Sequence, residues 1–472
     1  MHHWIRRSIQ ITIALILIGC TPALPLPFQA AQPTPTPAPT HTPAATPTRA
    51  PSPESTRTPE PTATLEPTLT AAPTATFEPI PPTVELVPLE QSERLDIFNR
   101  VWTLVRDRYV YEDYNGLDWE AIRIEYEPRI AAADTPEAFY QLLYQMIAKL
   151  NDEHSHYESP REVAEQQQQF EGELRYAGIG AVVRYVEEGG LITKIARNSP
   201  AEEAGLRPRD LILTINSIPF TDTERFGPGG PISMVRGEPG TTVRLRIRTS
   251  DNRIRDIDIV RRPIPSDAFL EVEGHLLDNN RIGLIRIDTF YANALDSQVR
   301  SELEYLVSNG PLDGLIIDLR DNGGGRIDLM LSTLGLVQDG GSIGKSSGRV
   351  REQELRVPAG QVIPELADTP IVVLIGPDSA SAAEMFAAGI RYLGRARIVG
   401  EPSAGNTENI VPHDLADGSR LWLAELTYRL PDGTEIEGIG VQPDRVVEGE
   451  WWRYAPEDDP QIIAAIELLR KP

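Results

Sequence analysis

A serine lies where a predicted buried strand gives way to a predicted helix. Ser381 follows the apolar run Ile371–Ile375 and directly precedes a helix predicted for residues 382–393. The free backbone N–H groups at a helix N-terminus face developing negative charge, which suits a serine that attacks a carbonyl group. Serines also cap helices routinely, so the position by itself favours a structural cap, and a nucleophile needs further support.

A glycine-rich turn is the second segment that could serve such chemistry. Residues 319–325 read Leu-Arg-Asp-Asn-Gly-Gly-Gly and follow a buried strand predicted for residues 312–319. The turn lacks the Lys-Ser/Thr pair of a nucleotide-binding P-loop, and its glycine spacing is not that of a dinucleotide-binding fingerprint. Its glycines therefore do not indicate a phosphate site.

Taken together, these segments resemble the carboxyl-terminal processing (tail-specific) serine peptidase family. Ser381 falls on the family's nucleophile, and residues 319–325 match its glycine-rich turn. Two further signatures match at residues 399–402 and 440–444, in the family's order, and the resemblance spans about residues 90–470. It implies a catalytic α/β domain of the crotonase-like (ClpP-like) type that hydrolyses peptide bonds.

The same resemblance implies an oxyanion hole made of backbone N–H groups. Ala382, which follows the nucleophile, and either Gly324 or Gly325 in the glycine-rich turn fall on the family's donors. Such donors stabilise the negative oxygen that forms when the serine attacks. Neither a metal ion nor an organic cofactor is implied, and the sequence has no Cys/His cluster with zinc-binding spacing.

The catalytic base departs from the family's commonest pattern. Many members use a lysine, but Asn406 occupies that position here, and an asparagine cannot act as a general base. The sequence instead resembles the branch exemplified by the tricorn core protease, which uses histidine and glutamate. His154, in the segment 150–157, and Glu437, in the segment 435–441, fall on those two residues.

A histidine and a glutamate form a chemically coherent pair for this role. Histidine titrates near neutral pH, so neutral His154 could accept the Ser381 proton, while the Glu437 carboxylate would orient the imidazole and stabilise the imidazolium. His156 is the alternative base, and Glu435 and Glu401 are the alternative carboxylates. The tricorn branch also has a serine just before its histidine, where this chain has Glu153, and Ser155 is the candidate to stand in for that serine.

The elements that would position these residues indicate a multidomain α+β chain. Strands alternate with helices after about residue 281, which predicts an α/β layer in a catalytic domain at residues 266–472. Apolar residues at three- and four-residue steps predict helices in an N-terminal region at residues 86–170. Short β runs between Gly- and Pro-marked turns fill residues 171–265.

Residues 171–265 resemble a PDZ domain of the bacterial protease type, on the segments 176–180, 195–206 and 209–216. In such a domain a peptide tail adds a strand to a sheet edge, and loop N–H groups bind the terminal carboxylate. The resemblance assigns that loop to Tyr176, Ala177, Gly178, Ile179 and Gly180. The alternative is a domain that only supports the catalytic part or binds an internal segment.

The first 85 residues are predicted to contain a targeting signal and a tether. Residues 9–18 form an apolar run that follows two arginines and is too short to span a bilayer, which is typical of a signal peptide at residues 1–19. The run ends in Leu-Ile-Gly-Cys, which resembles the lipobox of bacterial lipoproteins and makes Cys20 the lipidation site. An ordinary signal peptide with an incidental cysteine is the alternative. The Pro/Thr-rich residues 20–85 are predicted to be a disordered, semi-stiff tether.

Charge and composition limit the partners. The net charge of −24 repels phosphate backbones and argues against nucleic acid. The sequence therefore predicts an extracytoplasmic serine endopeptidase, anchored to the bacterial membrane by a lipid, that cuts protein or peptide substrates, with cleavage near C-termini as one option. The missing lysine motivates the alternative, a catalytically inactive lipoprotein that binds peptides or other ligands on the same scaffold.

Overall fold

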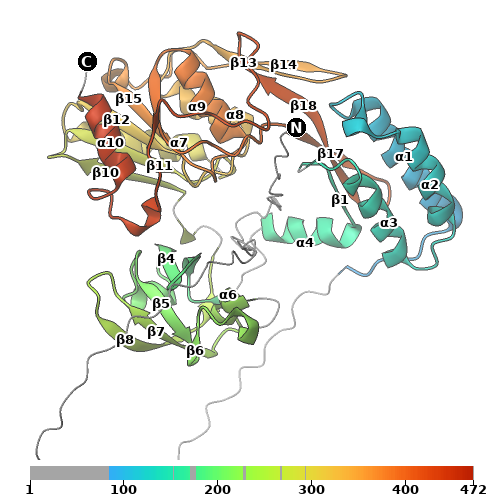
Figure 1. The fold of residues 1–472 in the computed structure, drawn as a ribbon, viewed down its shortest axis with the longest axis horizontal. Helices are drawn as coiled ribbons and strands as arrows, with labels where there is room; N and C mark the ends of the chain where they lie inside the picture. The colour runs from blue at the N-terminus through green and yellow to red at the C-terminus, as the bar shows by residue number, and fades with distance from the viewer. Residues whose placement is uncertain are drawn as a thin grey trace, which may run out of the picture. The chain divides into compact units, whose positions relative to one another are not determined.

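The computed structural model describes residues 84–470, apart from gaps at residues 153, 171–176, 227–229, 266–267, 270 and 293. The predicted signal peptide, Cys20 and residues 20–83 of the predicted tether lie outside the described residues, as do Glu153 and Tyr176. Within the described part, three groups of elements each enclose a buried apolar cluster (Figure 1). None of the described helices combines the length and the hydropathy that a membrane-spanning segment needs.

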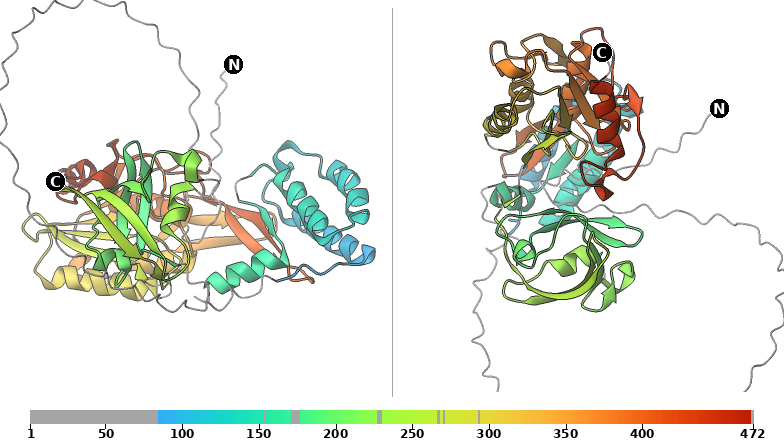
Figure 2. Two further views of the ribbon diagram at one scale, coloured as in Figure 1. Left: turned by 90° about the horizontal axis from the view of Figure 1, so that it is seen from below. Right: turned by 90° about the vertical axis from the view of Figure 1, so that its left-hand side faces the viewer.

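An N-terminal group of helices packs against a long strand from the C-terminal part of the chain. Its helices are α1 (Gln91–Arg108), α2 (Trp119–Ala131), α3 (Pro136–Ala148) and α4 (Pro160–Phe170). The Thr135 hydroxyl caps α3 by accepting a hydrogen bond from the Ala138 N–H at 3.2 Å, as the Thr-Pro start of this segment predicts. The apolar stripes of α1 to α3 share one buried cluster with β18 (Arg420–Arg429), and the helices gather beside that strand in Figure 2.

The middle of the chain forms an antiparallel sheet with the strand order β3-β4-β5-β7-β8. Its strands are β3 (Ala181–Val186), β4 (Gly189–Ile195), β5 (Leu211–Ile215), β7 (Thr242–Arg248) and β8 (Ile254–Val260), with β6 (Ile218–Pro219) beside β5. The short helices are α5 (Pro200–Glu203) and α6 (Gly230–Val235). Strand β3 lies at the sheet edge, so one row of its backbone groups can pair with an added strand.

The C-terminal group is built on a mostly parallel sheet with the order β10-β11-β12-β15-β16-β19. Only β10 runs antiparallel to its neighbour. The strands are β10 (Val272–Leu277), β11 (Ile282–Ile287), β12 (Gly314–Asp318), β15 (Ile371–Ile375), β16 (Ala396–Gly400) and β19 (Arg445–Val446). The α/β layer predicted from the alternation of strands and helices is therefore present, and β15 has the bounds of the predicted strand at residues 371–375.

Helices cover both faces of this sheet. One face shares a buried cluster with α7 (Leu295–Ser308), α8 (Ile327–Gly335) and α9 (Ala382–Tyr392). The other face packs against α10 (Pro460–Leu469), drawn in red in Figure 1. Because both faces are covered, β12 and β15 are buried along their whole length, which explains their continuous apolar runs.

A second sheet joins the N-terminal helices to the C-terminal group. Its order is β1-β18-β13-β14, with β17 also paired to β18, and its remaining strands are β1 (His156–Glu158), β13 (Ser342–Ser347), β14 (Glu352–Arg356) and β17 (Asn409–Asp414). His156 pairs with Trp422 across β1 and β18. This pairing brings the segment around residue 154, far upstream in the sequence, beside the C-terminal strands.

Candidate active site

Ser381 lies in the sharp turn between β15 and α9. Its backbone has φ 55° and ψ −120°, a conformation that costs a residue with a Cβ atom about 1–3 kcal/mol. The Ser381 N–H holds the turn by donating to the Asn406 carbonyl oxygen at 2.7 Å and to Glu384 Oε2 at 3.0 Å. A nucleophile on a strained strand-to-helix turn is a known arrangement in hydrolases.

Glu384, in the first turn of α9, ties a loop to this turn. Its side chain is fully buried and accepts hydrogen bonds from the Ser403 hydroxyl (2.5 Å) and from the N–H groups of Gly405 (2.7 Å) and Asn406 (2.8 Å). Together with the bond from the Ser381 N–H, these contacts place residues 403–406 directly against the serine. Sequence reasoning missed Glu384; its position three residues after a helix N-cap was the available signal.

The glycine-rich turn at residues 319–325 packs on Ser381 from the other side. Gly324 has φ +100°, and a Cβ atom there would lie 2.6 Å from the Ser381 Cβ, so only glycine fits. The Gly324 N–H donates to Asn322 Oδ1 at 2.8 Å. The N–H groups of Gly325 and Ala382, by contrast, donate no hydrogen bond to another described residue.

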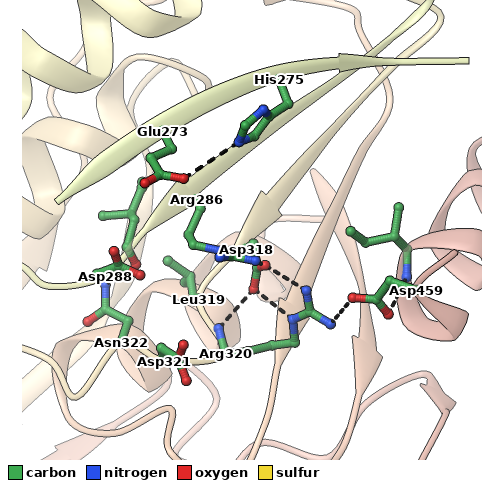
Figure 3. A network of polar contacts seen from close by, with 12 residues as sticks. Glu273, His275, Arg286, Asp288, Asp318, Leu319, Arg320, Asp321, Asn322 and Asp459 are labelled. Carbon is green, nitrogen blue, oxygen red and sulfur yellow. Dashed lines mark hydrogen bonds and ion pairs between the residues drawn. The ribbon is translucent and has the colours of Figure 1, made fainter. Parts of the chain in front are cut away.

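A buried ionic network supports the glycine-rich turn (Figure 3). Arg320 is fully buried between Asp318, at 2.7 Å, and Asp459, also at 2.7 Å, and its guanidinium lies 4.0 Å from the centre of the Trp451 ring. Burial raises the pKa of Asp318, but the charges of Arg320 and Arg286 outweigh that effect and lower this pKa to about 2. The network therefore fixes the start of the turn, three residues before its first glycine, Gly323.

Replacing Arg320 with leucine is expected to destabilise the C-terminal group by about 3–5 kcal/mol, because Asp318 and Asp459 lose the cation between them. Urea unfolding followed by tryptophan fluorescence measures the change, since Trp451 lies on the guanidinium. The matched control is Arg281→Leu, which breaks the solvent-exposed pair with Asp313 and should change stability little. Equal losses in both variants would contradict the assigned role of the network.

His154 lies in the segment between α3 and β1, with 8% of its surface exposed. Asp152 Oδ1 accepts hydrogen bonds from the backbone N–H groups of His154 and Ser155, and the Ser155 hydroxyl accepts one from the Ala424 N–H at 3.0 Å. The Ser155 hydroxyl thus anchors this segment to β18. The imidazole Nε2 lies 3.7 Å from Glu437 Oε1 and 3.7 Å from Glu408 Oε2.

Glu437 is connected to the serine through two consecutive residues. Its Oε2 accepts hydrogen bonds from the Thr407 N–H (2.6 Å) and the Thr407 hydroxyl (3.0 Å). Thr407 follows Asn406, whose carbonyl oxygen accepts the bond from the Ser381 N–H. The structure therefore brings His154, Glu437 and the Ser381 turn into one connected cluster. Among the described residues, no hydrogen bond joins the His154 ring to the Ser381 hydroxyl.

Glu408 is a second carboxylate at the histidine, and sequence reasoning missed it. The Tyr111 hydroxyl donates a short hydrogen bond to Glu408 Oε1, while Glu408 Oε2 faces His154 and has no hydrogen-bond partner. Tyr111 follows α1, 297 positions before Glu408. No local motif links the two residues, so only the packing of the N-terminal helices on β18 reveals the pair.

The charges in this cluster shift one another's protonation. Burial lowers the pKa of His154, but Glu437 and Glu408 outweigh burial and raise it above the usual histidine value. Burial raises the pKa of Glu437, but the nearby His154 and the hydrogen bonds from Thr407 outweigh burial and bring this pKa below its usual value. Burial raises the pKa of Glu408 to about 7, against the opposing charge of His154. Both the raised pKa of His154 and the lowered pKa of Glu437 therefore stabilise the ionised forms of the pair relative to the isolated groups.

The alternative residues face other partners. His156 Nε2 lies 3.6 Å from Glu158 Oε1, and its ring stacks on Trp422. Glu435 pairs with Arg429, and Glu401 accepts a hydrogen bond from the Gly449 N–H at 3.3 Å. The other His156 ring nitrogen, Nδ1, donates a hydrogen bond to the His154 carbonyl oxygen at 3.0 Å. In the part of the chain that the structure describes, Glu437 therefore faces the His154 imidazole, and no ion pair or hydrogen bond joins that ring to His156, Glu435 or Glu401.

The described part of the predicted carboxylate-binding loop adjoins the edge strand β3. Ala177 and Gly178 form β2, which pairs with β9 (Arg262–Pro263). The Ile179 and Gly180 N–H groups donate no hydrogen bond to another described residue, while their carbonyl oxygens accept bonds from the N–H groups of Ala201 and Ala196. These two N–H groups beside β3 thus have no acceptor among the residues that the structure describes.

Three family models match the chain. Peptidase family S41 matches residues 281–447, the PDZ domain matches residues 191–249, and the tricorn protease C1 domain matches residues 90–148. A carboxyl-terminal-processing protease from Picosynechococcus sp. is 30% identical over 386 residues, which cover 80% of this chain and 90% of that protein. The chain belongs to peptidase family S41, the carboxyl-terminal-processing proteases. The predicted family is thereby confirmed, and with it a serine-type peptidase that contains a PDZ domain.

Other members of family S41 share the fold at greater distance. The chloroplastic carboxyl-terminal-processing peptidase 2 of Arabidopsis thaliana is 27% identical over 358 residues, covering 74% of this chain and 68% of that protein. The solved photosystem II D1 C-terminal processing protease superposes with a TM-score of 0.52 at 22% identity, covering 76% of this chain and 94% of that one. The structure of a putative S41 protease from Bacteroides fragilis superposes with a TM-score of 0.54 at 16% identity, and the match covers 78% of this chain and 96% of that one.

Proposed function

We propose that this family S41 peptidase is an exported, membrane-tethered serine endopeptidase in which Ser381 is the nucleophile, His154 the general base and Glu437 its positioning carboxylate. The observation that carries the proposal is the cluster around residues 406–407. The Asn406 carbonyl oxygen accepts a hydrogen bond from the Ser381 N–H. The next residue, Thr407, donates to Glu437 Oε2, while Glu437 Oε1 faces His154. A histidine and a glutamate from distant segments thus take the role of general base that a lysine has in many members of the family.

The proposed reaction is acyl transfer to the serine and then to water. His154 removes the proton as Ser381 Oγ bonds to the scissile carbonyl carbon, and the carbonyl oxygen becomes an oxyanion. The N–H groups of Ala382 and Gly325 hold that oxyanion, since the Gly324 N–H is already bonded to Asn322. The C–N bond then breaks, the leaving amine takes the proton from His154, and water hydrolyses the acyl-enzyme by the reverse proton path.

The histidine must come within hydrogen-bonding reach of Ser381 for this chemistry, about 2.6–3.2 Å between heavy atoms. Catalytic hydrogen bonds are often absent in substrate-free enzymes and form when substrate binds. We expect the His154 ring to move only a short distance toward Ser381, because Glu437 already lies beside His154 and is hydrogen-bonded to Thr407, which follows Asn406.

Substrate recognition is proposed to involve the PDZ domain. A peptide tail would add to β3, with its terminal carboxylate at the unpaired N–H groups of Ile179 and Gly180. The proposed substrates are therefore extracytoplasmic proteins cut near their C-termini. Export and lipid attachment at Cys20, with residues 20–85 as a tether, are proposed from the sequence alone.

Labelling with a fluorophosphonate tests the proposed nucleophile and base together. Such probes phosphonylate a serine only where a base activates it, so the wild-type chain is expected to carry the label on Ser381, and His154→Ala should lose it. Peptide mapping by mass spectrometry identifies the labelled residue. Label on another serine, or full labelling of His154→Ala at normal fold, would overturn the proposal.

A further inference from the structure

Three side chains that could bind a metal ion converge at the proposed base. His154 Nε2, Glu408 Oε2 and Glu437 Oε1 all lie within 4.8 Å of one another, and the imidazole nitrogen is 3.7 Å from each oxygen. The three residues come from separate segments, before β1, before β17 and before β19. Spacing along the sequence therefore does not reveal them as a set.

One of these atoms lacks a partner. The Glu408 side chain is only 3% exposed, and its Oε2, on the side of His154, accepts no hydrogen bond from another residue that the structure describes. A buried carboxylate oxygen without a donor or a cation is energetically costly, so buried groups of this kind are almost always satisfied. The orphaned oxygen indicates that the gap between the three groups accommodates a positively charged ligand.

Both carboxylates also have the hydrogen bonds from neighbouring donors that usually orient metal-binding carboxylates. The Tyr111 hydroxyl donates to Glu408 Oε1, and the Thr407 N–H and hydroxyl donate to Glu437 Oε2. Each glutamate thus has one oxygen fixed by an outer donor, and its other oxygen is directed at His154. Such outer hydrogen bonds orient ligating carboxylates and strengthen their affinity for a metal.

We propose that His154, Glu408 and Glu437 form a Zn²⁺ site. One imidazole nitrogen and two carboxylate oxygens are a ligand set that suits zinc, whereas Mg²⁺ and Ca²⁺ prefer oxygen ligands alone. Zinc bonds of about 2.0–2.2 Å place tetrahedral ligands about 3.3 Å apart, so the two nitrogen–oxygen separations need to close by only a few tenths of an ångström. Water fills the fourth position.

The consequence for activity rests on the proposed function of His154. A zinc ion on the imidazole nitrogen holds the ring against the two glutamates and blocks its approach to Ser381. Bound zinc therefore inhibits peptide hydrolysis reversibly, and a chelator restores it. The binding itself does not depend on the catalytic assignment, so the two claims can be tested separately.

Calorimetric titration of zinc chloride into the full chain tests the binding. We use Ser381→Ala after chelator treatment, because this variant keeps all three ligands and cannot digest itself. One ion per chain is expected. Adding Glu408→Gln should weaken binding at least about tenfold, and Tyr111→Phe, which removes only the outer donor, by about 10–100-fold. His275→Asn is the matched control, since its pair with Glu273 is partly exposed, and it should leave the affinity unchanged.

Each outcome decides the proposal. Absence of binding, or binding that neither Glu408→Gln nor Tyr111→Phe weakens, overturns the site. Should Glu408→Gln fail to fold, Tyr111→Phe decides alone. Inhibition of the wild-type chain by zinc that needs about 10–100-fold more zinc in Tyr111→Phe supports the regulatory consequence. A wild-type chain that binds zinc but hydrolyses no peptide at any zinc concentration refutes the proposed catalytic function and leaves the metal site standing.

Discussion

Replacing Ser381 with alanine is expected to lower kcat/KM for peptide hydrolysis about ten-thousandfold or more. The variant removes the atom that forms the acyl bond, and what remains is binding and oxyanion stabilisation. The backbone conformation at this position, with φ 55°, is already strained for any residue with a Cβ atom, so alanine adds no new strain. Single-turnover cleavage of a fluorogenic peptide measures the effect.

The neighbouring serine is the matched control for this prediction. Ser379 is buried, and its hydroxyl donates to the Leu319 carbonyl oxygen at 2.8 Å and accepts from the Gly376 N–H. Ser379→Ala is therefore expected to cost stability but to leave fluorophosphonate label on Ser381 in the folded fraction. Comparable cleavage by Ser381→Ala and the wild type would exclude Ser381 as the nucleophile.

The second large effect is expected at His154. His154→Ala should lower kcat by about a thousandfold to ten-thousandfold, because general base catalysis and the activation of the serine are lost together. The melting temperature should change little. The substitution leaves in place the hydrogen bonds that hold this segment, from the backbone N–H of residue 154 to Asp152 and from the Ala424 N–H to the Ser155 hydroxyl. The parallel variant His156→Ala should keep most of the activity, because His156 pairs with Glu158. The reverse ranking would transfer the base to His156.

The pH profile separates a positioning role of Glu437 from a merely structural one. His154 must be neutral to accept a proton, and Glu437 and Glu408 raise its pKa, with Asp152 adding to the effect. The wild-type rate should therefore fall, as pH is lowered, at a pH above the usual histidine value. Glu437→Gln removes one raising charge, so it should lower kcat and also move this acid limb to lower pH, measured with a chelator present. An unmoved limb would argue that Glu437 acts only in folding.

Much of the fold followed from local pattern. The buried strands β12 and β15, the helices of the N-terminal region and the serine at the start of α9 were all predicted, because continuous apolar runs and periodicity act over a few residues. The resemblance of separate motifs predicted the peptidase family, and the relatives confirm that family. The predicted bounds of the domains and the roles of the site residues stay predictions.

The sequence by itself determined the catalytic family, the candidate serine and the absence of a lysine at position 406, since those depend on which residue stands in which motif. Only the tertiary structure decided which groups meet at the imidazole. Glu408 and Glu437 reach His154, and Tyr111 reaches Glu408, because β1 pairs with β18 and the N-terminal helices pack on the same strand. Contacts of this kind join residues hundreds of positions apart, and burial then makes their charges interact strongly, an effect that no local pattern encodes.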